Sequence, residues 1–107
     1  MLPRALRLRS GGEIREVVKS GQRFSSPLFT LHYLPSETSQ FAVITGRVLG
    51  NSVVRNRIKR RLLNALRPKL STELKIKGVF RMRQAAFTAS PEEWSDFLDQ
   101  ALKRVSS

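Results

Sequence analysis

Residues 51–67 read NSVVRNRIKRRLLNALR, a segment in which six cationic side chains and no acidic one accompany a helical repeat of apolar residues. At about 100° per residue, one side of such a helix collects Val54, Ile58, Leu62, Ala65 and Leu66. A helix that buries this stripe and offers only cations elsewhere suits a polyanion. The alternative is an ordinary solvated surface helix, but such helices intersperse acidic residues at i,i+4 spacing to relieve charge repulsion.

The cations of this segment surround the apolar stripe on three sides. Arg57, Arg60 and Arg67 fall opposite the stripe, together with Asn64. Arg55 and Lys59 share one flank, and Arg61 lies on the other. Because the segment contains no counter-charge of its own, the solvated surface helix is the weaker interpretation.

The composition agrees with a polyanionic partner. The chain has 107 residues and a formal net charge of +12, which indicates one domain over 1–107 that binds nucleic acid or an anionic membrane surface. It contains no cysteine, so disulfides and thiolate chemistry are excluded. The longest apolar stretch is only as long as a strand, so we expect a cytoplasmic protein without a membrane segment.

Turn and capping residues divide the chain into six elements after a basic, loosely held arm at 1–9. Helices are predicted at 11–20, where Ser10 and Glu13 form a capping pattern and Gly21 a C-cap, at 51–67, which Pro68 ends, and at 91–105. Strands are predicted at 27–34, 41–48 and 75–83. The short connection between the first two strands favours an antiparallel hairpin. The order predicts an α+β sandwich, with helices packed on a small mixed sheet.

Side chains suited to protein-based catalysis are scarce. His32 is the only histidine, and four of the eight acidic residues fall in the last predicted helix. No acidic pair has the spacing of a metal site or a glycosidase dyad. We therefore expect no catalytic residue, no bound metal and no small-molecule substrate.

RNA is the nucleic acid that this inventory suits best. The chain holds 14 arginines to 6 lysines, and the planar guanidinium contacts phosphates bidentately and stacks on bases. A helix-turn-helix reader of DNA would need a helix before the basic helix, whereas strands precede it here. A sheet with polar and aromatic side chains beside a basic helix favours structured or single-stranded RNA.

Several motifs in this order resemble the bacterial ribonuclease P protein family. The basic helix carries Arg55-Asn56-Arg57 and follows a turn of the type G-N-x-V at 50–53, the first helix ends in K-x-G at 19–21, and the last strand ends in Arg83. The resemblance covers about 4–105. It implies the two-layer α-β-β-β-α-β-α sandwich of that family, with three helices on a mixed sheet of three to four strands.

The resemblance also implies a helper of catalysis. In that family a large RNA uses Mg²⁺ to remove the 5′ leader of precursor tRNA, and the protein binds both that RNA and the single-stranded leader. The chain would be the non-catalytic subunit of an endoribonuclease, with no cofactor of its own and monomeric without RNA. The alternatives are a generic ribosomal or structured-RNA-binding protein without a role in tRNA processing, a cationic membrane-surface domain, and a protein-only nuclease.

Site residues follow by matching the family's motifs to this sequence. The resemblance assigns leader binding to Arg55, Asn56, Lys59, Ile14, Val18, Thr30 and His32, in a cleft between the sheet and the basic helix. It assigns contact with the catalytic RNA to Arg57, Arg60 and Arg61, and the helical wheel adds Arg67. Many relatives have aromatic residues where this chain has Ile14, Val18 and His32. Since base stacking is worth roughly 1–3 kcal/mol per base, the two aliphatic residues predict weaker leader binding.

Overall fold

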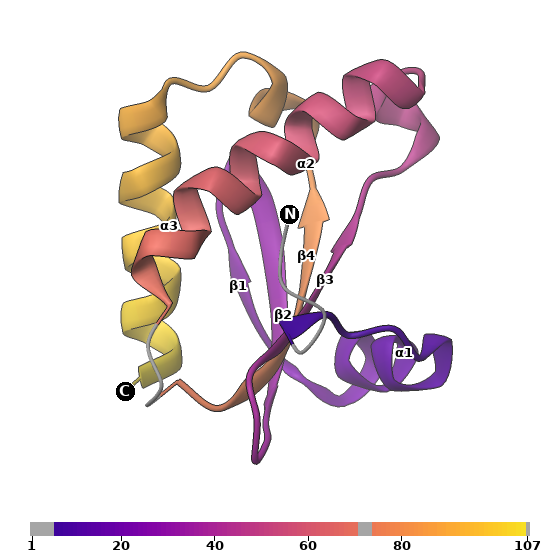
Figure 1. The fold of residues 1–107 in the computed structure, drawn as a ribbon, viewed down its shortest axis with the longest axis vertical. Helices are drawn as coiled ribbons and strands as arrows, with labels where there is room; N and C mark the ends of the chain where they lie inside the picture. The colour runs from indigo at the N-terminus through magenta and orange to yellow at the C-terminus, as the bar shows by residue number, and fades with distance from the viewer. Residues whose placement is uncertain (1–5, 71–73, 107) are drawn as a thin grey trace.

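The computed structural model describes residues 6–70 and 74–106. Its main elements are α1 (Gly11–Ser20), β1 (Gln22–Ser25), β2 (Phe29–Pro35), β3 (Gln40–Ile44), α2 (Ser52–Leu66), β4 (Ile76–Met82) and α3 (Pro91–Ser106). Three short 3-10 turns follow β3, α2 and β4, namely η2 (Arg47–Leu49), η3 (Arg67–Lys69) and η4 (Gln84–Phe87). The implied order α-β-β-β-α-β-α, with three helices on a mixed sheet, is confirmed, and of the expected three to four strands the sheet has four (Figure 1).

The sheet differs from the expected hairpin arrangement. Its strand order is β1-β2-β4-β3, so β4 lies between β2 and β3. β4 pairs antiparallel with β2 and parallel with β3, and α2 makes the connection from β3 to β4. The hairpin prediction for 27–34 and 41–48 is therefore wrong. β4 takes the central place because it has buried apolar residues on both faces, as Phe80 and Val79 show.

One face of the sheet packs against α2, which crosses in front of it in Figure 1, and against α3, which stands at the left. From the sheet this core takes Phe29, Leu31, Phe41 and Phe80, and from the helices it takes Ile58, Leu62, Leu66, Trp94 and Leu98. Ile58, Leu62 and Leu66 are fully buried, which confirms the centre of the predicted stripe. Leu63 is also buried, although it was not placed on the stripe. Because these residues of α2 are buried against the sheet, the opposite side of the helix is exposed to solvent.

The opposite face packs against α1 and the segment before it. Val17 of α1 and Leu8 meet Val79 in a second, smaller core. Leu8 donates its backbone N–H to the carbonyl of Phe41 at 2.8 Å, and Arg7 forms an isolated parallel bridge with Phe41. Leu8 is thus part of the fold, in contrast to the expected loosely held arm over 1–9, because burial of its apolar side chain anchors the backbone beside β3. Residues 1–5 of that arm lie outside the described residues.

The predicted capping pattern at α1 is confirmed, since the Ser10 hydroxyl accepts the N–H of Glu13 at 3.4 Å. Asn51 caps α2 by accepting the N–H of Val54, and Ser90 and Glu93 form a reciprocal capping box at α3.

Gly21 follows α1 as expected but has φ −75°, so its backbone does not need a glycine for its dihedral angles. A Cβ at this position would instead meet the carbonyl oxygens of Val17 and Tyr33, the latter at 2.7 Å. Close packing of α1 on β2 is the reason for glycine here.

All three predicted strands are shorter than expected, since the third, predicted over 75–83, covers only Ile76–Met82, and one strand was missed. β2 begins at Phe29 because the Ser26 hydroxyl bonds to the backbone of Leu28 and Phe29 and closes a turn there. β3 ends at Ile44, before η2. The strand β1 was not predicted, since its four residues are mostly polar and exposed.

Candidate nucleic-acid interface

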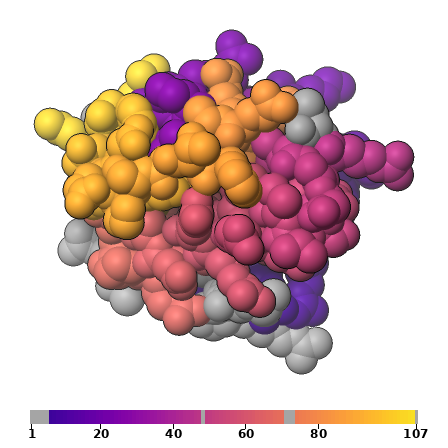
Figure 2. Space-filling model, turned by 90° about the horizontal axis from the view of Figure 1, so that it is seen from above, coloured from indigo at the N-terminus to yellow at the C-terminus, as the bar shows by residue number. Residues whose placement is uncertain are grey.

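The outer side of α2 is a row of exposed cations. Arg57, Arg60 and Arg67 are exposed, as the wheel predicts from the burial of Ile58 and Leu62. Arg61 is exposed as well, and its Nη1 donates to the carbonyl of Phe87 at 2.6 Å. In Figure 2 α2 lies beside α3 and beside the segment that follows β4. This second segment contains Phe87, the residue that Arg61 contacts.

One flank of α2 is less exposed. Arg55 and Lys59 are half-buried, whereas Asn56 is exposed. The Nη2 of Arg55 donates to the Ser52 hydroxyl at 3.3 Å, and its Nε is buried without a hydrogen-bond partner among the described residues. Since Arg55 and Lys59 are one turn apart, they present two cations along the same edge of the helix.

Three adjoining pockets connect this flank with the sheet. The first, of about 240 Å³, has Lys59 of α2, Ala42 of β3 and Ile14 of α1 among its lining residues. The second, of about 360 Å³, shares Ile14 and adds Val18 and Arg81. The third, of about 290 Å³, shares Arg81 and reaches Thr30 and His32. Because consecutive pockets share a lining residue, we describe them together as the sheet cleft.

The sheet cleft brings together five of the seven residues expected to bind a leader, namely Ile14, Val18, Thr30, His32 and Lys59. Neither Arg55 nor Asn56 lines any of the three pockets in the described part of the chain. The position of the cleft also differs from the one expected between the sheet and the basic helix. Thr30 and His32 lie on the sheet face that bears α1, and α2 reaches the cleft only around the edge strand β3.

The third pocket, which we call the inner end of the cleft, is strongly cationic. Arg23 is paired with His32 across β1 and β2, and Arg81 is paired with Thr30 across β2 and β4. Arg83 completes this end. His32 is only 6% exposed, and burial lowers the pKa of its imidazole, with further lowering by Arg81 and Arg23. His32 is therefore neutral near pH 7.

Sequence reasoning did not assign a site role to Arg23 or Arg81. The neighbours of Arg81 depend on the register of β4 with β2. Arg23 belongs to β1, the strand that was not predicted. The available signal was the alternation of 76–83, which puts Val79, Arg81 and Arg83 on one face.

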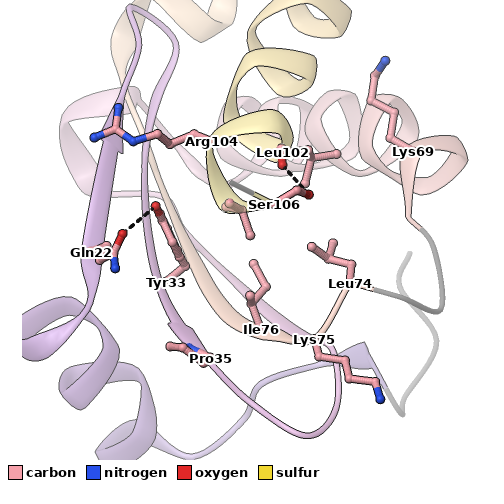
Figure 3. Close-up of a pocket in the computed structure, with 11 residues that line it drawn as sticks. Gln22, Tyr33, Pro35, Lys69, Leu74, Lys75, Ile76, Leu102, Arg104 and Ser106 are labelled. Atoms are coloured by element: carbon pink, nitrogen blue, oxygen red, sulfur yellow. Dashed lines mark hydrogen bonds between the residues drawn. The ribbon is translucent and has the colours of Figure 1, made fainter.

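A separate hollow of about 550 Å³ lies on the other face of the sheet, near the C-terminal end of α3 (Figure 3). Tyr33, Gln22 and Leu102 are among its lining residues, and the Tyr33 hydroxyl donates to Oε1 of Gln22 at 3.0 Å. It shares no lining residue with the sheet cleft. It therefore takes no part in the surface that joins α2 to Thr30 and His32.

Residues 6–70 and 74–106 contain neither a cluster of metal-ligating side chains nor a helix that could span a membrane. No group of three or more histidine, cysteine or acidic side chains in these ranges has the arrangement of a metal site. No helix there has the length and apolar character needed to cross a membrane.

Comparison with known proteins points to one family. The family model described as Ribonuclease P matches residues 2–106. The chain is 32% identical to the ribonuclease P protein component of a Nocardioides species, over 100% of this chain and 97% of that protein. It is also 32% identical to the component of Acidothermus cellulolyticus, over 99% and 92% of the two chains. The fold resembles the RNase P protein of Staphylococcus aureus, with a TM-score of 0.81 at 21% identity over 94% of each chain.

Proposed function

Because this chain belongs to the ribonuclease P protein family, whose model spans nearly all of it, we propose that it assists a catalytic RNA in cleaving the 5′ leader from precursor tRNA. In this proposal the chain binds both the catalytic RNA and the single-stranded leader. Family membership favours this role over that of a generic ribosomal or structured-RNA-binding protein.

The observation that carries the proposal is the continuity of the sheet cleft. Lys59, Arg81 and Arg23 supply cations along its length, and Ile14 and Val18 supply apolar surface between them. A single RNA strand has this alternation of phosphates and flat apolar bases, and proteins bind it through positively charged grooves with aromatic platforms, whose place aliphatic side chains take here. A cleft of this kind suits an extended strand better than a duplex.

The two RNA partners would then use different surfaces of the same helix. Leader contacts are assigned to Arg55, Asn56, Lys59, Ile14, Val18, Thr30 and His32. Contacts with the catalytic RNA are assigned to Arg57, Arg60, Arg61 and Arg67. The division is supported by the exposure of the second set on the outer side of α2 and by the place of Lys59, which is half-buried and lines the cleft.

In this proposal the protein contributes binding and orientation, and the RNA contributes bond cleavage. The imidazole of His32 is buried among cations and has a lowered pKa, which makes it a poor general base for a phosphodiester. We assign the Mg²⁺ of the reaction to the RNA and no cofactor to this chain. Neutralising phosphates with arginine and lysine would lower the Mg²⁺ that the complex needs. The same proposal includes a monomeric protein without RNA, working in the cytoplasm.

Reconstitution tests this function directly. The chain is added to a bacterial ribonuclease P RNA at limiting Mg²⁺, and 5′ cleavage of a precursor tRNA with a leader of several nucleotides is followed. We expect cleavage to rise, and Lys59→Gln to lose part of that rise. Lys103→Gln, which removes an equal charge from the exposed side of α3, should retain it. Unchanged cleavage on addition of the folded wild-type chain would refute the proposed function.

A further inference from the structure

The inner end of the sheet cleft has a structure that general affinity for RNA does not explain. Arg23, Arg81 and Arg83 come from two strands and the residue after β4, and they line one pocket of about 290 Å³. Among the described residues, none of the three forms an ion pair with an acidic side chain. Like charges placed together repel one another. A fold that assembles three guanidiniums here gains stability when an anion joins them.

The floor of this pocket contains a second unsatisfied group. His32 is 6% exposed, and its Nε2 is buried without a hydrogen-bond partner in the described part of the chain. A buried polar atom without a hydrogen-bond partner destabilises the protein that contains it. Thr30, which is 8% exposed, adds a hydroxyl beside it. The pocket therefore combines charge and hydrogen-bonding capacity that remain unused within the protein itself.

The chemistry of these groups selects a phosphate. The guanidinium of arginine matches the oxygens of a phosphate group with two parallel hydrogen bonds, so several arginines can surround one such group. A hydroxyl and a neutral imidazole N–H add donors without requiring a charge. We propose that this pocket is a phosphodiester-binding subsite that sets the register of a single RNA strand in the sheet cleft.

The adjoining pocket, lined by Ile14, Val18 and Ile44, suits the nucleoside next to a bound phosphate, which favours a phosphate within a strand. Arg81 lines both pockets, and beyond it the cleft becomes apolar at Ile14, Val18 and Ile44. Ile44 is 37% exposed, which leaves apolar surface open to a partner. With a phosphate held at Arg81, the adjoining nucleoside would lie over these aliphatic side chains. The identity of the strand as a tRNA leader rests on the proposed function, whereas the subsite itself does not.

The first test uses the whole protein and inorganic phosphate. The side-chain nitrogens of His32 are followed by NMR while phosphate replaces chloride at constant ionic strength. We expect a saturable shift and a higher pKa for His32, because a bound anion favours the imidazolium. Arg23→Gln should weaken phosphate binding about tenfold, the factor that corresponds to the loss of one charge-assisted contact. An identical response to chloride and phosphate would overturn the subsite.

The matched control separates the pocket from net charge. Lys103→Gln removes the same charge from an exposed position on α3. Charges farther than the Debye length of about 8 Å are largely screened at physiological salt. This variant should therefore bind phosphate as the wild type does. Equal weakening by Arg23→Gln and Lys103→Gln would mean that phosphate responds to net charge only, and the subsite would be refuted.

The second test decides whether the phosphate belongs to a strand. A short oligouridylate with a 5′ hydroxyl should produce the same His32 shift and compete with inorganic phosphate. Replacing one internal phosphate by a neutral methylphosphonate should weaken its binding to the wild type but not to Arg81→Gln. A response to inorganic phosphate with none to the oligonucleotide would overturn the register role. Neither test contains ribonuclease P RNA or Mg²⁺, so their failure is distinguishable from failure of the proposed function.

Discussion

Arg57 and Ile58 are neighbours in the chain but have opposite environments, since Arg57 is exposed and Ile58 is fully buried. The helical repeat turns Ile58 toward Phe80 and the rest of the main core, and this burial holds the cation beside it at the surface. Folding and RNA binding therefore depend on adjacent residues that can be altered separately.

The first prediction separates these two roles. Ile58→Ala should lower the free energy of unfolding by about 2–5 kcal/mol, because it leaves a cavity between α2 and the sheet. Arg57→Ala should leave the free energy of unfolding nearly unchanged and weaken binding to the catalytic RNA. Urea unfolding and filter binding of the two variants check this. If Arg57→Ala were the more destabilising change, the assigned orientation of α2 would be wrong.

The second prediction concerns salt. If cations along the cleft contact phosphates, the logarithm of leader affinity should fall linearly with the logarithm of salt concentration, at about 0.7 per neutralised phosphate for a single strand. Lys59→Gln should make this slope shallower, since Lys59 lines the cleft. The slope is measured by titrating a single-stranded oligonucleotide at several salt concentrations. A flat plot would contradict the account of the cleft.

The three helices and the strands β2, β3 and β4 were predictable because each has a local signal, whereas the short, mostly exposed β1 has none. The Asn51 cap and the box of Ser90 and Glu93 define where α2 and α3 begin, and alternation defines β4. The strand order was not predictable in this way. Whether β3 pairs with β2 or β4 depends on which strand can be buried on both faces, and that property involves the packing of α1 and α2 together.

The residues of the candidate site also fall into two groups, those with a local sequence signal and those whose position depends on strand pairing and packing. The exposed cations of α2 follow from the helical repeat alone, so Arg57, Arg60 and Arg67 could be found from the sequence. The juxtaposition of Arg23 with His32 required the register of β1 on β2. The location of Thr30 and His32 on the face away from α2 required knowledge of which sheet face α2 covers.

The third prediction concerns the close approach of α1 to β2. Gly21→Ala should destabilise the protein by about 1–3 kcal/mol, the usual cost of overpacking, because its Cβ would meet backbone oxygens of Val17 and Tyr33. Gly11→Ala is the matched control, since the nearest atom to its Cβ is the flexible end of Arg15 at 3.7 Å. Thermal melting compares the two. Equal stability of both variants would contradict the stated packing.

The fourth prediction concerns the aliphatic platform of the cleft. Ile14→Phe should strengthen binding of a single-stranded oligonucleotide by up to about 1–3 kcal/mol, because a ring can stack on a base. The half-buried Ile14 borders two pockets, which leaves room for the larger side chain. Val53→Phe, at a position that is 66% exposed on α2 and outside the cleft, serves as the control. Fluorescence anisotropy measures both, and equal gains would assign the effect to general hydrophobicity.

The last prediction uses the lowered pKa of His32. The folded protein holds this imidazole below its ordinary pKa of 6.5 through burial and through Arg81 and Arg23. The unfolded chain therefore binds more protons than the folded one as the pH falls through 6.5, and the free energy of unfolding must decrease in that direction. Urea unfolding between pH 7.5 and 5.5 (values of roughly one unit on either side of the ordinary pKa) measures this loss.

His32→Gln removes the titrating group and keeps a polar side chain in the same place. Its free energy of unfolding should therefore depend less on pH over this interval than that of the wild type. Saturating phosphate should also reduce the pH dependence of the wild type, because an anion beside Arg81 offsets the part of the lowered pKa that comes from the arginines and leaves the larger part, due to burial. Parallel pH profiles for the wild type and His32→Gln would mean that His32 titrates normally, contrary to its burial between two arginines.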